Sequence, residues 1–220
     1  MLKPDKIVRS ARKTLSVSVD ALGKVTVRAP KSCSDERIHA FLQSKENWIL
    51  RHKAQGERAR ARLPHGALDG YSLMLLGQSY TLVLTDEKTI TFDEPNRRIY
   101  LPKRNAQTRL IQWLKDNALR IFTGITERRA REMNVVYKTV KVNSARSKWG
   151  CCTYDNELRY SFRLLYAPKE VIEYVVTHEL AHVRHKNHSS AFWREVANYL
   201  PDYKSRRGWL KENRILMQIF

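Results

Sequence analysis

The tightest constraint on this chain is the pentapeptide His178-Glu179-Leu180-Ala181-His182. Residues four apart lie on one face of an α-helix, so this spacing lets two imidazoles approach a single metal ion. A helix is favoured here by apolar residues that recur at helical spacing from Ile172 to Val183. Pro168 suits the first turn of such a helix. We therefore predict a helix over about residues 168–185 that carries two metal ligands.

The residue types at this motif predict a zinc-dependent hydrolase. Catalytic zinc binds three protein ligands and keeps one position open for water. Glu179 adjoins the first histidine and can take a proton from that water, so we predict it to be the general base. His185 and His188 are both candidates for the third ligand; His188 is favoured because the chain beyond the helix can turn back over the metal. Other divalent metals accept the same ligands as Zn²⁺.

The motif at 178–182 is accompanied by Asn187-His188-Ser189 and Phe192-Trp193 after it, and by Ser147–Cys152, Arg163-Leu164 and Ala167-Pro168 before it. Together these residues resemble the YgjP-like metallopeptidases, which are relatives of the SprT-like and other zincin families. The resemblance implies that His188 is the third ligand and that the activity is peptide hydrolysis. It also implies an α+β fold with a zincin-like core, in which the two-histidine helix packs behind a small sheet. This sequence departs from the family in having Lys148 where arginine is usual and Cys151 where serine is usual.

Periodicity along the rest of the chain indicates an α+β protein, because strands come first and mixed helices and strands follow. We expect an N-terminal region over residues 1–104, built from a β-hairpin, a helix and strands, and a metal-binding catalytic domain over residues 105–220. The expected elements are a hairpin at 14–29, a helical stretch at 34–62 broken at Pro64-His65-Gly66, strand runs at 72–84 and 89–101, a helix at 108–133, strands at 135–142 and 157–164, the metal helix, a helix from Ser189 or Ser190 to Tyr199, and a helical tail after Pro201.

Three basic residues are candidates for substrate binding. Residues 157–164 alternate in polarity, which places Arg159 and Arg163 on the polar face of a predicted strand. Their forked donors suit phosphate or carboxylate oxygens, although a solvated strand face explains the same pattern. Lys148 lies in the stretch that resembles the family motif and is the third candidate. Trp193 is expected to be a core aromatic rather than part of a stacked surface.

The charge balance leaves three functions open. The chain carries 41 Lys and Arg residues against 22 Asp and Glu residues, a net charge of +19, and this field attracts polyanions. Peptide hydrolysis is favoured by the family resemblance. Phosphoanhydride hydrolysis, for example of a nucleoside triphosphate, is the alternative, with Lys148, Arg159 and Arg163 balancing the phosphate charge. The third reading is a nucleic-acid-binding module with structural zinc, but structural sites usually fill all four positions, often with cysteine.

The remaining composition predicts a cytoplasmic protein with no membrane association. Only three cysteines occur, which argues against a disulfide framework. The first residues lack the apolar stretch of a signal peptide, and no apolar run approaches the length of a membrane span.

Overall fold

The computed structural model describes residues 3–60 and 68–220, and the chain divides into two compact units, residues 1–63 and 64–220. Over the described residues the fold is α+β, as predicted, with six helices and three small sheets. The division between the units differs from the boundary expected after residue 104. The expected break at Pro64-His65-Gly66 lies outside the described residues.

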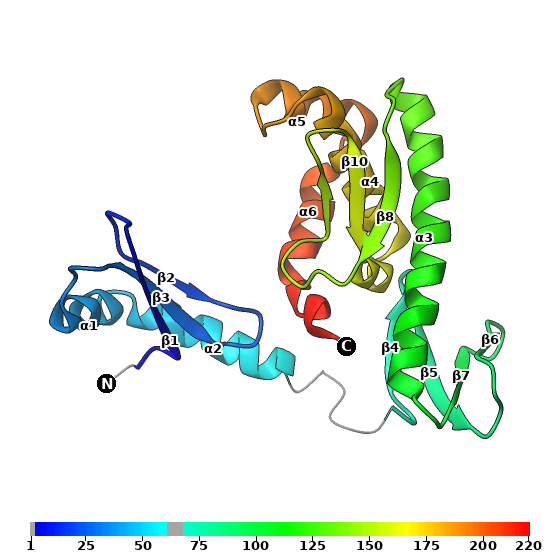
Figure 1. Cartoon of the computed structure of the whole chain (residues 1–220), viewed down its shortest axis with the longest axis horizontal. Helices are drawn as coiled ribbons and strands as arrows, with labels where there is room; N and C mark the ends of the chain where they lie inside the picture. Colours follow the sequence, from blue (N-terminus) through cyan, green and yellow to red (C-terminus); the bar gives the residue numbers. More distant parts are fainter. Residues whose placement is uncertain (1–2, 61–67) are drawn as a thin grey trace. The chain divides into compact units, whose positions relative to one another are not determined.

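The first unit is a three-stranded sheet with two helices (Figure 1). Its strands are β1 (Lys6–Ser10), β2 (Ser16–Val19) and β3 (Val25–Pro30), in the order β1-β3-β2. The predicted hairpin is confirmed in the antiparallel pair β2–β3, whereas β1, which pairs parallel to β3, was not predicted. The helical stretch predicted over residues 34–62 forms two separate helices, α1 (Asp35–Gln43) and α2 (Glu46–Arg60). Both helices contribute to the core formed with β3, through Ile38 and Leu42 on α1 and Ile49 on α2.

The second unit begins with a four-stranded sheet in the order β4-β5-β7-β6. The strands are β4 (Ser72–Leu75), β5 (Gln78–Thr85), β6 (Thr91–Asp93) and β7 (Arg98–Pro102). Leu76 and Gly77 join β4 to β5 with φ values of 52° and 83°, the left-handed backbone of a tight hairpin. The Leu76 amide donates to the Leu165 carbonyl at 2.8 Å, and a Cβ on Gly77 would lie 3.4 Å from Pro168. This sheet therefore packs with the residues that precede the metal helix, which explains why it belongs to the second unit.

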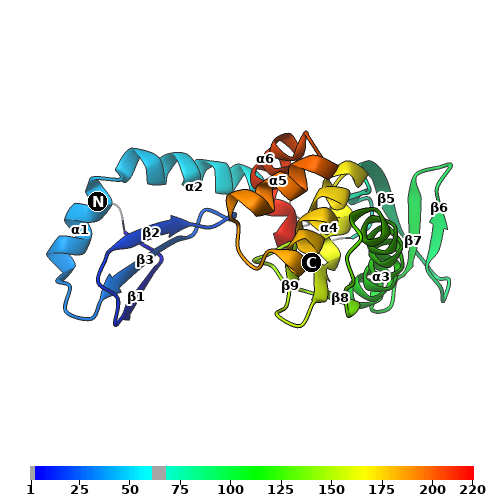
Figure 2. The same cartoon turned by 90° about the horizontal axis from the view of Figure 1, so that it is seen from above.

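The rest of the second unit surrounds the predicted metal helix, α4 (Lys169–Arg184). This helix contacts α3 (Ala106–Met133), α5 (Ser190–Tyr199), α6 (Tyr203–Glu212) and β9 (Gly150–Cys152). Figures 1 and 2 show α4 between α3 on one side and α6 on the other. Strands β8 (Thr139–Asn143), β9 and β10 (Glu157–Ser161) form a sheet in the order β8-β10-β9, and the short helices η1 (Phe162–Tyr166) and η2 (Arg214–Gln218) complete the unit.

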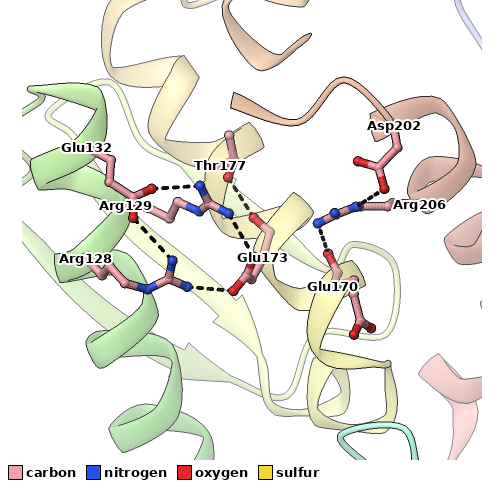
Figure 3. Close-up of polar contacts among 8 residues, drawn as sticks. All are labelled: Arg128, Arg129, Glu132, Glu170, Glu173, Thr177, Asp202 and Arg206. Carbon is pink, nitrogen blue, oxygen red and sulfur yellow. Dashed lines mark hydrogen bonds and ion pairs between the residues drawn. The ribbon is translucent and has the colours of Figure 1, made fainter. Parts of the chain in front are cut away.

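An ion-pair cluster fixes α4 against α3 (Figure 3). Arg128 and Arg129 of α3 each donate to the Glu173 carboxylate of α4, at 2.6 and 2.8 Å. The Thr177 hydroxyl donates to the Glu173 carbonyl at 2.8 Å, one helical turn further along α4. Because Thr177 directly precedes His178, the cluster holds the part of α4 on which the motif begins.

In the part of the chain that the structure covers, no helix combines the length and apolarity that crossing a membrane requires.

Candidate metal centre

Helix α4 places His178 and His182 on one side of a buried helix. The apolar face of this helix is fully buried, with an exposed fraction of 0% for Ile172, Val176 and Leu180. The helix therefore cannot rotate about its axis without exposing these core residues. The imidazole rings of His178 and His182 lie 5.0 Å apart between centroids, one helical turn from each other. The predicted helix and the shared face of its two histidines are therefore present.

His188 lies in the loop between α4 and α5 and turns back over the helix. The Nε2 atom of His188 lies 3.0 Å from Nε2 of His178 and 3.2 Å from Nε2 of His182. Two hydrogen bonds to the turn between β9 and β10 hold this loop. The Lys186 ammonium donates to the Asn156 side chain at 2.6 Å and to the Thr153 carbonyl at 3.3 Å. Three imidazole nitrogens thus converge at one point.

The donor set fits a divalent metal ion. Two nitrogens bound tetrahedrally at 2.0–2.1 Å from zinc lie about 3.3 Å apart, close to the separations found here. His182 Nδ1 is 2.8 Å from the carbonyl oxygen of His185, and since a carbonyl only accepts, Nδ1 carries the proton and leaves the Nε2 lone pair free. Among residues 3–60 and 68–220, the ligand atoms grouped at this point belong to His178, His182 and His188.

The histidines of α4 are held in the neutral form that binds metals. Burial, followed by the positive charge of His182, His188 and Arg207, lowers the pKa of His178 to about 3. The pKa of His182 is also lowered, chiefly by burial. A neutral imidazole keeps a lone pair on one of its two ring nitrogens, whereas a protonated one cannot coordinate a metal.

His185, the alternative third ligand, is engaged elsewhere. Its Nε2 lies 2.6 Å from the Glu195 carboxylate of α5, a side chain that is 9% exposed. Glu195 also accepts from Arg184 at 2.7 Å, and Arg184 donates in turn to the carbonyl oxygen of Met133 at the end of α3. This network holds the end of α4, and it directs the His185 ring away from the converging nitrogens.

Glu179 lies against the edge strand β9. Its side chain is 5% exposed, and a Cβ built on Gly150 would lie only 2.8 Å from Glu179 Oε1 and 2.9 Å from its Cγ. Burial raises the pKa of Glu179 to about 8, while a hydrogen bond from the backbone of Cys152 and the charge of Lys148 act in the opposite direction. The Glu179 side chain therefore lies directly against the backbone of β9, and any side chain at position 150 would require Glu179 to shift.

Lys148 is the one predicted substrate-binding residue that the structure brings to this region. Its side chain is exposed and its ammonium is close enough to Glu179 to lower the pKa of that carboxyl. It lies two residues before Gly150, on the segment that leads into β9.

Arg163 is not available to a substrate, which corrects its expected placement. The predicted alternation stops at Ser161 because the chain enters η1 at Phe162. Arg163 consequently turns into the interior and is 2% exposed. Its guanidinium donates to the carbonyl oxygens of Ser144 and Ile219, both at 2.9 Å, and also to that of Phe220.

Arg159 lies on the face of its sheet away from the histidines, a second correction. Tyr160 and Gly150 are register partners and share the face against the helices, where Tyr160 contacts Phe122 of α3 and Gly150 approaches Glu179 of α4. Arg159, the neighbour of Tyr160, therefore points to the opposite face. There it forms an ion pair with Glu157.

Aromatic residues of α4, α5 and α6 also contact the histidine cluster or one another beside it. Trp193 of α5 stacks on His188, with ring centroids 5.6 Å apart and an interplanar angle of 21°, and on Tyr203 of α6 at 5.3 Å and 18°. Tyr174 packs edge-on against His178 with centroids 5.8 Å apart. Trp193 was expected to be a core residue, but it is only partly buried and stacks directly on His188. Only the helical spacing of Tyr203 and Arg207, four residues apart, hints at this arrangement in the sequence.

Comparisons with known proteins place the chain in a family. Among solved structures, the chain is similar to the metallopeptidase zymogen of Pyrococcus abyssi abylysin, with 21% identity over 40% of this chain and 90% of that chain and a TM-score of 0.38. It is similar to the metallopeptidase zymogen of Methanocaldococcus jannaschii jannalysin, with 21% identity over 41% of this chain and 91% of that chain and a TM-score of 0.36. A search of curated proteins finds no match. The family model described as YgjP-like, metallopeptidase domain, matches residues 13–213. The chain therefore belongs to the YgjP-like metallopeptidase family.

Proposed function

We propose that this protein is a zinc-dependent metallopeptidase in which His178, His182 and His188 hold the metal and Glu179 is the general base. The observation that carries the proposal is the convergence of three Nε2 atoms: that of His188 lies 3.0 Å from that of His178 and 3.2 Å from that of His182. The carboxyl group of Glu179, the residue after His178, is buried. Family membership supports hydrolysis of a polypeptide.

Zinc is the metal that the donor set favours. Three imidazole nitrogens with an open fourth position are typical of catalytic rather than structural zinc, which usually has four protein ligands. Zinc bound in this way lowers the pKa of water to about 7 and polarises a carbonyl group. The open position also argues against the alternative of a nucleic-acid-binding module with structural zinc.

We assign the proton transfers of the reaction to Glu179. Glu179 directly follows His178 in the sequence, and its carboxyl group lies against Gly150 of β9. In the metal-free protein, a pKa of about 8 keeps this group largely protonated at neutral pH. The charge of a bound dication would favour the carboxylate. The carboxylate can then accept a proton from the attacking water and pass it to the leaving amine nitrogen.

Lys148 completes the proposed substrate side of the site. It is exposed and its charge reaches Glu179, so it can meet a polar group of a substrate that lies along this segment. Arg159 and Arg163 have no part in the proposal, because one lies on the opposite face of the sheet and the other is buried. The alternative of phosphoanhydride hydrolysis required three cations to balance the phosphate charge, and two of these three are absent from the site.

A Glu179→Gln substitution tests the proposal. The variant keeps the size of the side chain and all three histidines, so it should bind zinc with near wild-type stoichiometry and lose at least about 100-fold in turnover. Metal content is measured first, and cleavage of an unstructured protein is then followed alongside phosphate release from nucleoside triphosphates. Peptide cleavage that needs both the metal and Glu179 supports the proposal. Unchanged turnover in the variant refutes Glu179 as the base, and phosphate release without peptide cleavage refutes the peptidase.

A further inference from the structure

Helix α6 carries Arg207 next to the histidine cluster, and the proposed reaction gives this cation no role. The Arg207 guanidinium lies over the Trp193 ring, with Cζ 4.9 Å from the ring centroid. Trp193 itself stacks on His188, so Arg207 is one aromatic ring removed from a proposed metal ligand. Its charge also contributes to lowering the pKa of His178, after burial and the two other histidines. Arg207 is therefore fixed next to the site by a specific contact.

The donors of Arg207 are available. Within residues 3–60 and 68–220, its guanidinium has no hydrogen bond or ion pair, and its side chain is exposed. The adjacent residue shows the contrast in Figure 3, where Arg206 bonds to the Asp202 carboxylate at 2.9 Å and to the Glu170 carbonyl at 2.8 Å. Arg206 is thus part of the framework, whereas Arg207 keeps its N–H groups free for a ligand.

The cation–π contact with Trp193 determines where this guanidinium lies. A guanidinium that lies on an aromatic ring is attracted to the ring face and keeps its in-plane N–H donors pointing outward. Tyr203, one helical turn before Arg207, stacks on the same Trp193 ring and holds it in place. Planar forked donors of this kind are suited to two oxygens of a carboxylate or phosphate group.

We propose that Arg207, held against Trp193, forms an anion subsite that binds an oxyanionic group of the substrate beside the three-histidine centre. This inference rests on the proposed function, in which the substrate is a polypeptide. The oxyanion is then a carboxylate, either of an acidic side chain or of a peptide terminus. The subsite therefore favours acidic peptides over neutral ones.

The subsite is tested by ligand binding rather than by turnover. The probes are hydroxamates, which bind catalytic metals, that carry a carboxylate tail of one to four methylene groups, each with a carboxamide counterpart. Binding to the zinc-loaded full chain is measured by calorimetry at low salt, where charge interactions are least screened. The wild-type protein should bind the best carboxylate probe about tenfold more tightly than its carboxamide, since a charge-assisted bidentate contact is added.

Matched variants assign the preference to one residue. Arg207→Gln should reduce the preference to below about twofold, while Arg207→Lys should retain part of it because the charge remains. Lys204→Gln removes one positive charge from an exposed position on the same helix and should leave the preference unchanged. The affinity for the carboxamide probe reports on the metal site itself, so the ratio of the two affinities isolates the subsite.

The outcomes separate this inference from the proposed function. No carboxylate preference in the wild-type protein, or the same preference in Arg207→Gln, overturns the subsite even when peptides are cleaved. A preference that depends on Arg207 in a protein that cleaves no peptide upholds the subsite and refutes the peptidase. A phosphonate tail that binds through Arg207 more tightly than every carboxylate tail overturns the assignment to a peptide carboxylate.

Discussion

Replacing Gly150 with alanine should inactivate the enzyme without removing its metal. A Cβ at this position would lie 2.8 Å from Oε1 and 2.9 Å from Cγ of Glu179, whereas non-bonded heavy atoms ordinarily approach to about 3.5–4.0 Å. Glu179 would have to move by about 0.6–1 Å, and its 5% exposure leaves little free volume for that movement. Misplacement of a catalytic group by about 1 Å costs on the order of 100-fold in rate, so kcat should fall by about that factor.

The assay combines peptide hydrolysis with a zinc titration of the same Gly150→Ala protein. The atoms nearest to the added methyl group all belong to Glu179, so the histidine nitrogens should keep their positions and the zinc affinity should stay within about threefold. Overpacking should also lower the free energy of unfolding by about 1–3 kcal/mol, measured by urea denaturation.

Gly124→Ala is the matched control. Gly124 is exposed on α3, and an added Cβ there would have no neighbour within 4 Å. Activity should be unchanged and stability should rise by about 0.5–1 kcal/mol, as expected for alanine in a helix. Wild-type kcat in Gly150→Ala would refute the argument that β9 positions Glu179, and loss of zinc would show that the strand positions the ligands instead.

Three further predictions follow from the structure. Burial raises the pKa of Glu179 above its unfolded value to about 8, so the stability of the metal-free protein relative to Glu179→Gln should fall as pH rises from about 5 to 8, by up to about 1.4 kcal/mol per pH unit. The comparison of thermal melts with Glu179→Gln is needed because the lowered pKa of His178 acts in the opposite direction in both proteins, and an equal pH dependence of the two would contradict the burial of Glu179 as a protonated group. His188→Ala should weaken zinc binding by at least about 100-fold and His185→Ala by less, as measured by competition with a chelator; the reverse order would exchange the two assignments. Arg163→Ala should lower the free energy of unfolding, measured in urea, by about 3 kcal/mol or more, because buried carbonyl groups lose their hydrogen-bond donor. Arg159→Ala should change it by less than about 1 kcal/mol, because its ion pair with Glu157 is partly exposed, and equal losses in the two variants would contradict the difference in burial.

The sequence by itself determined the part of the site that depends on local geometry. Any α-helix brings residues i and i+4 onto one face, so His178 and His182 were expected together before their surroundings were known. The apolar residues from Ile172 to Val183 and the position of Pro168 were enough to predict this helix, and it spans Lys169–Arg184. The hairpin at residues 14–29 was predictable for the same reason, because strand alternation and the turn at Asp20–Gly23 are adjacent in the chain.

Arg159 and Arg163 show where local pattern fails. The alternation of polarity over residues 157–164 was read correctly as far as Ser161, but alternation does not reveal which face of a strand meets the helices. Packing on α3 and α4 turned Arg159 away from the site, and the switch to η1 turned Arg163 into the interior. The boundary between the units was misplaced for a similar reason, since the β4–β5 hairpin contacts Pro168 across more than ninety residues.

Only the tertiary structure brought Gly150 onto Glu179 and Arg207 onto Trp193. These pairs are separated by 29 and 14 residues, and their contacts require β9 to lie at the sheet edge and α5 and α6 to pack on α4. No periodicity encodes such contacts, because they depend on how separate elements are oriented once their apolar faces are buried together. The metal ligands on α4 were therefore predictable from spacing, whereas the groups that position the base and surround the substrate were decided by packing.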